Sequence, residues 1–351
     1  MVWRLAELAL IDEINEQPEV AARLLAEAGP EIAALADVIR EVDPSNVVIA
    51  ARGTSDHAAI YAQYALGVMA GISVGLATPS VHSLYGAAPD YSRDLVIGIS
   101  QSGASPDVVG VIRAARSQGA LTLAITNTPG SDMAEAAAHH IALRAGPELA
   151  VAATKTYTAT LLVLAMLTAE LSDTDASADL AEVPQALARA LELDDESARI
   201  AADMSTLDRC IILGRGYHYA TAREWSLKLK ELSYTLADPY SSADFIHGPL
   251  ALIESGFPTF CVAPRGATEA DMEAVIDRVG GELGARLLIA SDSERLLDKG
   301  TWALRLPTTL PEWLMPIASI VPGQLHARNV TIAKGGDPEQ PRSIRKVTRT
   351  N

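Results

Sequence analysis

The sequence predicts an α/β protein built from two similar, doubly wound subdomains with parallel sheets, with helices at the N-terminus and a closing tail at the C-terminus. Short apolar, β-branched runs alternate with helical stretches of about 12–15 residues, the pattern of a parallel sheet covered by helices. The strand-then-glycine run VVIAARG returns as CIILGRG, so that Gly216 stands 163 positions after Gly53. The length of 351 residues also fits two domains of roughly 100–200 residues each.

The first forty residues are predicted to form helices. Apolar residues share one helix face as far as the dipeptide Gln17-Pro18, namely Leu5, Leu8, Ala9, Ile11 and Ile14. A second helix is predicted over 19–42, with a break at Gly29-Pro30 because proline cannot donate a backbone hydrogen bond. Residues 1–40 are therefore assigned to N-terminal helices.

The first subdomain is predicted over 41–190. Its strands are short apolar runs that end in glycine- or hydroxyl-rich loops, at 47–50, 95–100 and 121–127. Helices are expected over 58–70 and 106–118. The polar, acidic stretch 172–179 and the helix after it mark the boundary with the next subdomain.

The second subdomain is predicted over 191–335 and repeats the same theme. Its strands lie within 210–216, 259–264 and 286–291, and a helical stretch is expected over 269–279. Residues 336–351 are assigned to a C-terminal tail that closes over the site.

The composition is that of a globular protein with an acidic balance. Hydrophobic residues make up 49% and charged residues 21% of the chain, and 28 Lys plus Arg against 44 Asp plus Glu give a net charge of −16. Nucleic acids and anionic membranes attract concentrated positive charge, so we expect neither as a partner. A small anion held by a few backbone N–H groups is compatible with this charge.

The two cysteines, Cys210 and Cys261, lie in apolar runs that are predicted to be buried strands. Two cysteines cannot build a disulfide framework or a four-cysteine zinc site, and no metal site is expected. The N-terminus carries acids inside its apolar pattern, which is typical of an amphipathic helix rather than of a signal peptide. We therefore expect a cytoplasmic protein.

Three hydroxyl-rich loops are expected at the carboxyl edges of the predicted strands, where open parallel sheets bind their ligands. They are GTS at 53–55, SQSGAS at 100–105 and VAATKT at 151–156. Hydroxyls and the N–H groups of a helix N-terminus can hold a phosphate without formal charge. Helix capping is the alternative for a single loop of this kind, but two dense loops after successive strands favour phosphate binding.

Several charged or glycine-containing features have an ordinary structural interpretation as well. The pair Gly214-x-Gly216 lacks the third glycine of a dinucleotide fingerprint, so no nicotinamide cofactor is expected. Lys228 and Glu231 lie three positions apart and share a helix face, as pairs on solvated helices also do. His247, which precedes a Gly-Pro turn, fits either a structural histidine or a proton shuttle.

Six motifs together resemble the double sugar-isomerase (SIS) domain family. In the order of that family they are ARGTS (51–55), SQSGAS (100–105), AVAATKT (150–156), SLKLKELSY (226–234), HGPLALI (247–253) and KGGDPEQPRSIRKVT (334–348). The family includes the isomerase half of glutamine–fructose-6-phosphate amidotransferase and stand-alone amino-sugar-6-phosphate deaminases. The resemblance covers nearly the whole chain and implies SIS-type, flavodoxin-like subdomains.

The resemblance also implies residue roles, carried over motif by motif. Glu231 would move a proton between C1 and C2 of the sugar, and Lys228 would support it electrostatically. His247 would assist ring opening from the partner subunit of a homodimer, and Lys346 would form a Schiff base or assist at that carbon. The implied contacts to the hexose or hexosamine 6-phosphate are Thr54, Ser55, Ser100, Gln101, Ser102, Ser105, Val151 and the backbone of Arg345.

The chain departs from the synthase pattern at several positions. Val2 stands where the synthase has its terminal cysteine nucleophile, so we expect no glutaminase domain and no release of ammonia from glutamine. Ala153 replaces a serine that contacts the sugar, and Ala104 replaces the acid that follows SQSG. The run SPD after Ala104 is more similar to the stand-alone deaminases.

The expected reaction is aldose–ketose isomerisation coupled to loss of ammonia, from glucosamine 6-phosphate and water to fructose 6-phosphate, or the reverse, without a cofactor. Two alternatives remain. A 6-phosphofructosamine deglycase would share the phosphate loops and Glu231 but would need a larger pocket beside Ala153. A non-catalytic sugar-phosphate sensor would lack the acid/base set, whereas this chain retains Glu231, His247 and Lys346.

Overall fold

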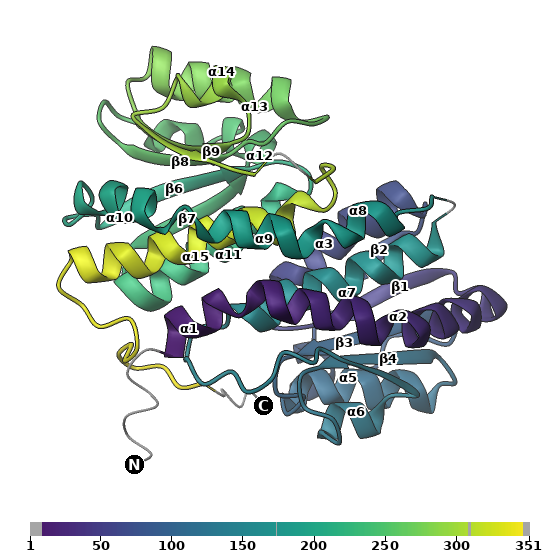
Figure 1. Ribbon diagram of the computed structural model, residues 1–351. Coiled ribbons are helices and arrows are strands. Elements are labelled where there is room, and N and C mark those ends of the chain that lie inside the picture. The colour runs from purple at the N-terminus through teal and green to yellow at the C-terminus, as the bar shows by residue number, and fades with distance from the viewer. Residues whose placement is uncertain (1–8, 173, 308–309, 347–351) are drawn as a thin grey trace. The chain divides into compact units, whose positions relative to one another are not determined.

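The computed structural model describes residues 9–172, 174–307 and 310–346 (Figure 1). Within these ranges the chain forms two compact units, each with one five-stranded parallel sheet. The first-sheet unit comprises the described parts of 19–148, 155–181 and 345–351. The second-sheet unit comprises the described parts of 1–18, 149–154 and 182–344. This division into compact units does not test the domain boundaries expected from the sequence, which stay a prediction.

The first sheet has the strand order β2-β1-β3-β4-β5, and every neighbouring pair is parallel. Its strands are β1 (Asn46–Ala50), β2 (Val74–Leu76), β3 (Asp94–Ser100), β4 (Leu121–Thr126) and β5 (His139–Ala142). The middle strands are nearly continuous apolar runs because helices cover both faces of the sheet.

Helices cover the first sheet on both faces. Those of this unit are most of α2 (Gln17–Val42), α3 (Thr54–Met69), α4 (Ser80–Ser83), α5 (Pro106–Ser117), α6 (Asp132–Ala136), α7 (Lys155–Leu171) and α8 (Ser177–Ala181). α5 and α6 lie on one face, while α3 and α7 pack together on the other (Figure 1). A core of small and β-branched side chains, including Val96, Val108 and Ile112, joins α5 to the sheet.

The second sheet has the order β10-β9-β8-β6-β7 and is also parallel throughout. Its strands are β6 (Arg209–Gly214), β7 (Leu236–Ser241), β8 (Pro258–Val262), β9 (Arg286–Ser291) and β10 (Trp302–Arg305). Numbered within each sheet, both orders read 2-1-3-4-5, which is the flavodoxin-like doubly wound arrangement. The predicted fold class of two similar α/β subdomains is thus confirmed.

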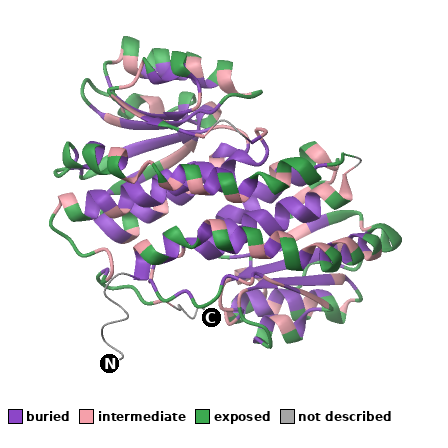
Figure 2. Ribbon diagram, viewed as in Figure 1, coloured by how far each residue is buried: buried purple, intermediate pink, exposed green. Residues whose placement is uncertain are grey.

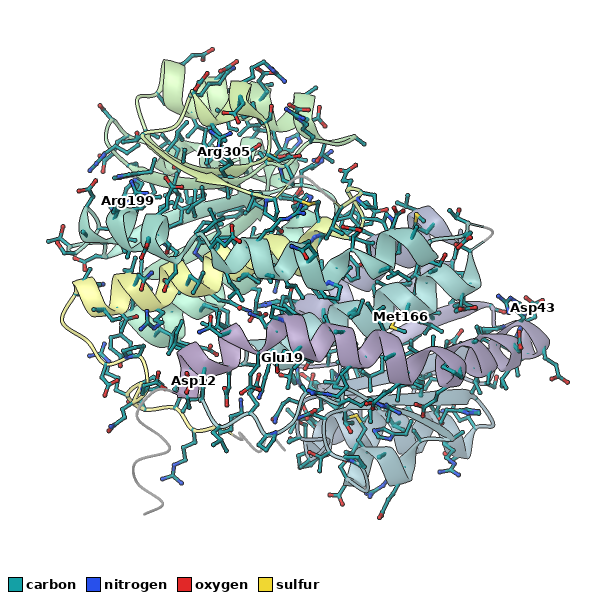
Figure 3. All side chains as sticks on the ribbon, in the orientation of Figure 1. Asp12, Glu19, Asp43, Met166, Arg199 and Arg305 are labelled. Atoms are coloured by element: carbon teal, nitrogen blue, oxygen red, sulfur yellow. The ribbon has the colours of Figure 1, made fainter. Side chains whose placement is uncertain are left out.

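The helices of the second-sheet unit include one long buried helix, α15 (Met315–Ala333). The others are α1 (Ala9–Asn15), α9 (Val183–Leu191), α10 (Asp194–Ala202), α11 (His218–Lys228), α12 (Ser242–Ile246), α13 (Glu269–Ile276) and α14 (Glu294–Leu297). α15 packs against α1, α9, α10 and α11, and its residues are mostly buried, as Figure 2 shows. Many charged side chains of this unit are exposed, for example Asp12, Arg199 and Arg305, whereas Met166 of α7, in the first-sheet unit, is buried (Figure 3).

The predicted internal repeat appears in the backbone. Gly53 follows β1 with φ 55° and Gly216 follows β6 with φ 58°, positive φ values that glycine adopts at little steric cost. Each glycine turns the chain from the first strand of its sheet into the helix that follows. The strand-then-glycine pattern therefore marks the same position in both subdomains.

The predicted break at Gly29-Pro30 is wrong, because α2 continues through Pro30. Apolar residues on both sides of the proline, including Leu24, Ala28 and Ile32, are fully or almost fully buried. Their burial outweighs the one backbone hydrogen bond that proline cannot make. The helix predicted over 58–70 begins earlier, at Thr54, and the predicted residues 1–8 of the first helix lie outside the described residues.

Both cysteines lie in strands as predicted, Cys210 in β6 and Cys261 in β8, and both are buried free thiols. Burial raises the pKa of both, that of Cys261 to about 12. In the described part of the chain, no helix is both long and apolar enough to cross a membrane.

A buried aromatic cluster connects α11, β8 and α15. The indole Nε1 of Trp225 donates to Nδ1 of His326 over 3.3 Å. The Phe260 ring packs at a tilt against the Trp225 ring and edge-to-face against the His326 ring. At Gly323 a Cβ would lie 2.9 Å from Cγ of Trp225, so the close approach of α15 requires glycine. The cluster thereby fixes α11, the helix that carries Lys228.

Two buried histidines should make stability fall in acid. Burial lowers the pKa of His218 and of His326 to about 3, against 6.5 when exposed. Below pH 6.5 these two histidines are therefore protonated in the unfolded chain but stay neutral in the folded chain. As a result, the free energy of unfolding falls by about 1.4 kcal/mol per pH unit per histidine until the pH nears 3. Urea unfolding of the wild type and of His218→Gln/His326→Gln from pH 7 to 4 checks this. Equal slopes for the two proteins would contradict it.

Candidate functional site

Two of the predicted hydroxyl-rich loops lie at one edge of the first sheet. GTS follows β1 and SQSGAS follows β3, and these strands are parallel neighbours, so both loops leave the sheet at its carboxyl edge. Thr54 and Ser55 begin α3, and Ser105 immediately precedes α5. The sequence thus places the start of one helix in each loop, where backbone N–H groups and hydroxyls gather.

The second loop is shaped by its own serines. Oγ of Ser100 accepts the N–H of Gly103 over 3.1 Å, and Oγ of Ser102 accepts the N–H of Ala104 over 3.3 Å. Ser100 is buried, while Gln101 and Ser102 are partly exposed. These contacts curl the loop so that it ends at the N-terminus of α5, whose helix dipole favours an anion.

Lys346 lies in the first-sheet unit together with these loops. Its Nζ is 2.6 Å from Oε2 of Glu148, a carboxylate with no exposed surface. The same carboxylate accepts the backbone N–H of Thr156 over 3.1 Å and its hydroxyl over 2.9 Å, at the start of α7. Glu148 therefore ties the C-terminal tail to α7. The adjacent Arg345 is exposed.

Sequence reasoning missed Glu148. The one available signal was an acid two positions before the motif AVAATKT, but an isolated glutamate in a loop is ordinarily solvated. Only the burial of the carboxylate and its pairing with Lys346, 198 positions away, distinguish it.

In the second-sheet unit, Lys228 and Glu231 meet as predicted. Nζ of Lys228 lies 2.6 Å from Oε2 of Glu231 and 3.3 Å from Oε1 of Glu224. Lys228 and Glu224 are fully buried, whereas the Glu231 side chain is 24% exposed. The cluster is thus no solvated surface pair, and Glu224 is a second residue that the sequence reasoning missed.

Backbone geometry and charge both shape this cluster. Glu231 lies in a π-helical segment, Leu229–Ser233, that widens the end of α11 and is followed by Tyr234 in the left-handed conformation. Burial alone would lower the pKa of Lys228, but the carboxylates of Glu224 and Glu231 raise it above its usual value. Lys228 therefore stays charged and fixes the position of the Glu231 carboxylate.

His247 and Val151 also belong to the second-sheet unit. His247 directly follows α12 and is exposed, and its backbone N–H donates to the carbonyl of Asp244 over 3.2 Å. Val151 is partly buried in a segment whose backbone N–H groups at Leu149 and Ala150 donate to Glu13. The predicted residues therefore divide between the units: Val151, Lys228, Glu231 and His247 in one, and the loop serines and threonine with Arg345 and Lys346 in the other.

The matching loop of the second sheet is filled by the protein's own carboxylates. Gly266 follows β8 at the same 163-residue spacing from Gly103 that relates Gly216 to Gly53. Beside it, the N–H of Ala267 donates to Glu312 over 2.8 Å and the N–H of Arg265 donates to Asp292 over 2.7 Å. The N–H groups of Arg265 and Ala267 in this loop are thus already paired with the protein's own carboxylates.

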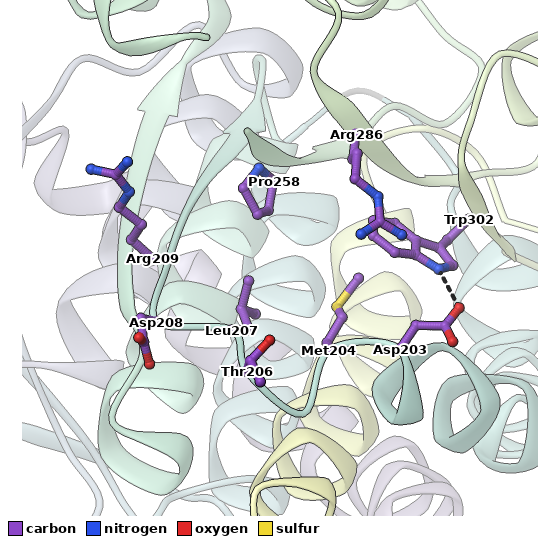
Figure 4. Close-up of a pocket in the computed structure, with 9 residues that line it drawn as sticks. All are labelled: Asp203, Met204, Thr206, Leu207, Asp208, Arg209, Pro258, Arg286 and Trp302. Carbon is purple, nitrogen blue, oxygen red and sulfur yellow. Dashed lines mark hydrogen bonds between the residues drawn. The ribbon is translucent and has the colours of Figure 1, made fainter. Parts of the chain in front are cut away.

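A cavity of about 260 Å³ lies at the opposite, amino edge of the second sheet (Figure 4). The first residues of four strands line it, namely Arg209, Pro258, Arg286 and Trp302. The Arg286 guanidinium stacks 4.1 Å from the centre of the Trp302 ring, whose Nε1 donates to Asp203 over 3.0 Å. None of the predicted site residues lines this cavity.

Comparison with known proteins agrees with the fold and the motifs. Over 339 residues the chain is 35% identical to the glutamine–fructose-6-phosphate aminotransferase [isomerizing] of Methanothermobacter thermautotrophicus, covering 96% of this chain and 56% of that protein. The corresponding protein of Pyrococcus horikoshii is 33% identical over 344 residues, with 96% and 57% covered. The chain therefore spans little more than half the length of these curated relatives.

Solved structures give the same result. The C-terminal domain of the Francisella tularensis glucosamine-fructose-6-phosphate aminotransferase is 28% identical, with a TM-score of 0.86 over 95% of this chain and 98% of that one. A protein of Silicibacter pomeroyi DSS-3, provisionally named a phosphosugar isomerase, is 35% identical, with a TM-score of 0.85 over 94% and 99%.

The family model of the SIS domain matches this chain twice, over residues 42–170 and 204–333. The two matches cover both parallel sheets, and the chain therefore belongs to the SIS domain family.

Proposed function

We propose that the chain is a phosphosugar aldose–ketose isomerase that acts as an amino-sugar-6-phosphate deaminase. Glucosamine 6-phosphate and water give fructose 6-phosphate and ammonia, or the same residues run the reverse reaction. Membership of the SIS domain family supports phosphosugar chemistry, and the names of the aligned relatives support fructose 6-phosphate and its amino derivative as the sugar.

The observation that carries the proposal is the cluster of Glu224, Lys228 and Glu231. Isomerisation needs a base that removes a carbon-bound proton and returns it to the neighbouring carbon. One of the two carboxylates around the buried ammonium, Glu231, is partly exposed and held at 2.6 Å by Lys228. Glu231 therefore transfers the proton between C1 and C2, and Lys228 fixes the orientation of its carboxylate.

Lys346 acts at the carbonyl carbon of the open-chain ketose. A neutral amine attacks a carbonyl, and loss of water gives the imine. The Glu148 carboxylate, 2.6 Å from Nζ, is within reach to accept the ammonium proton. Because Glu148 is also bonded to Thr156, it holds the lysine in place.

The remaining roles concern binding and ring opening. The hydroxyls and N–H groups of Thr54, Ser55 and the SQSGAS loop bind the 6-phosphate, and Val151 and the Arg345 backbone line the sugar. His247 is exposed, which fits a proton shuttle for ring opening in the site of the partner subunit of a homodimer.

A substrate panel tests the proposed function. Ammonia release is measured from glucosamine 6-phosphate and galactosamine 6-phosphate, release of the free amino acid is measured from a 6-phosphofructosamine adduct, and fructose 6-phosphate with ammonium is run in reverse. We expect turnover of a hexosamine 6-phosphate. Turnover of the fructosamine adduct alone would establish a deglycase instead, and binding without turnover in either direction would establish a sensor.

Replacing Glu231 by Gln should lower kcat by about 10²–10⁴-fold, because the acid/base is lost while the phosphate contacts remain. The dissociation constant of the sugar phosphate should change by no more than about threefold. Glu282→Gln removes the same charge from an exposed site in the second-sheet unit and serves as the control. Full activity of Glu231→Gln would refute the assigned proton transfer.

Replacing Glu148 by Gln should lower kcat about tenfold or more, since Lys346 loses its anchor and its proton acceptor. Trapping of the imine with borohydride should fall in parallel, as read by the mass of the labelled protein. Glu135→Gln, an exposed glutamate of α6, is the matched control. An unchanged trapping yield would show that Glu148 does not act through Lys346.

A further inference from the structure

One ion pair connects the two loops of the candidate phosphate site. Nε and Nη2 of Arg52 both lie 2.8 Å from Oδ2 of Asp107. Arg52 directly precedes Gly53 in the loop after β1, and Asp107 is the second residue of α5, two positions after Ser105. The pair therefore bridges the start of α5 and the start of α3.

The two partners have very different surroundings. The Asp107 side chain is 1% exposed and the Arg52 side chain 49% exposed. The other oxygen of Asp107, Oδ1, accepts the N–H of Val108 over 2.9 Å. Both carboxylate oxygens are thus engaged, one by the helix backbone and one by the guanidinium.

The position of Asp107 matters for any anion bound at these loops. A phosphate at the N-terminus of α5 would lie within the first turn of the helix that contains this buried carboxylate. Two anions repel strongly where water is excluded, and a buried carboxylate without its partner carries an uncompensated charge. The loops themselves contribute neutral hydroxyls and N–H groups, so the charge balance depends on Arg52.

We propose that Arg52 is a positioning residue that sets the affinity of the site for phosphorylated sugars. It neutralises Asp107 and clamps the two loops at the spacing that a phosphate group requires. The inference rests on the proposed function, because it takes these loops as the phosphate site. It adds that the hydroxyl-lined loops bind a dianion only while the carboxylate beneath them is paired.

The arrangement gives an unusual mutational signature. Arg52→Gln leaves Asp107 buried and unpaired, and should raise both the KM for glucosamine 6-phosphate and the Kd for inorganic phosphate about tenfold or more, with kcat within about threefold. Asp107→Asn keeps the acceptor for Val108 and removes the charge. In the double variant Arg52→Gln/Asp107→Asn both constants should therefore return to within about threefold of the wild type.

The measurements are isothermal titration with each ligand and steady-state kinetics with glucosamine 6-phosphate. Arg113→Gln, which removes a charge from an exposed position of α5, is the matched control and should leave both constants unchanged. Arg52→Lys retains the positive charge and should restore most of the affinity. Melting temperatures of all variants are recorded, because a purely structural role of the pair would lower stability without this pattern of rescue.

The outcomes separate this inference from the proposed function. If the wild type binds neither glucosamine 6-phosphate nor inorganic phosphate, both the proposed phosphate site and this inference are wrong. If the wild type binds but Arg52→Gln binds equally well, only the inference falls. If the double variant is as weak as Arg52→Gln, Arg52 contacts the phosphate itself, and the neutralising role is wrong.

Discussion

The structure depends on the burial of parallel strands on both of their faces. Strands such as β3 and β8 are mostly apolar, because helices cover each sheet on both faces and leave the strands buried. Polar and charged groups are therefore displaced to the loops, and the parallel direction collects those loops at one edge of each sheet. The two subdomains share this constraint, and their glycines at positions 53 and 216 share a positive φ.

Three ion pairs, one in the second-sheet unit and two in the first-sheet unit, follow one physical pattern. In each, a charged group that is at most 1% exposed holds a partner that is more open to solvent. They are Lys228 with Glu231, Glu148 with Lys346, and Asp107 with Arg52. Because an unpaired charge in a dry interior is costly, the buried member fixes where its partner lies. The more open partner is thereby held in one orientation, so that it loses less side-chain entropy if it binds a ligand.

Sequence reasoning found the central strands and missed the edges. The six predicted strands correspond to β1, β3, β4, β6, β8 and β9, while β2, β5, β7 and β10, the outermost strands of both sheets, were not predicted. Central strands are buried on both faces and are therefore continuous apolar runs in the sequence, which makes them recognisable. Edge strands such as Val74–Leu76 are short and partly exposed, so their sequences carry no such signal. The wrong break at Pro30 has a related cause, since tertiary burial of the surrounding helix overrode the local preference of proline.

The sequence by itself determined the fold class, the repeat, the order of the family motifs and the contact of Lys228 with Glu231, because these depend on local periodicity and on spacing along one helix. Only the tertiary structure showed that Glu148 and Asp107 are buried and paired with distant cations. Glu148 meets Lys346 across 198 positions, and Asp107 meets Arg52 across 55. The pairing and burial of a charge depend on segments distant in the chain, and a buried carboxylate looks in the sequence like any solvated one.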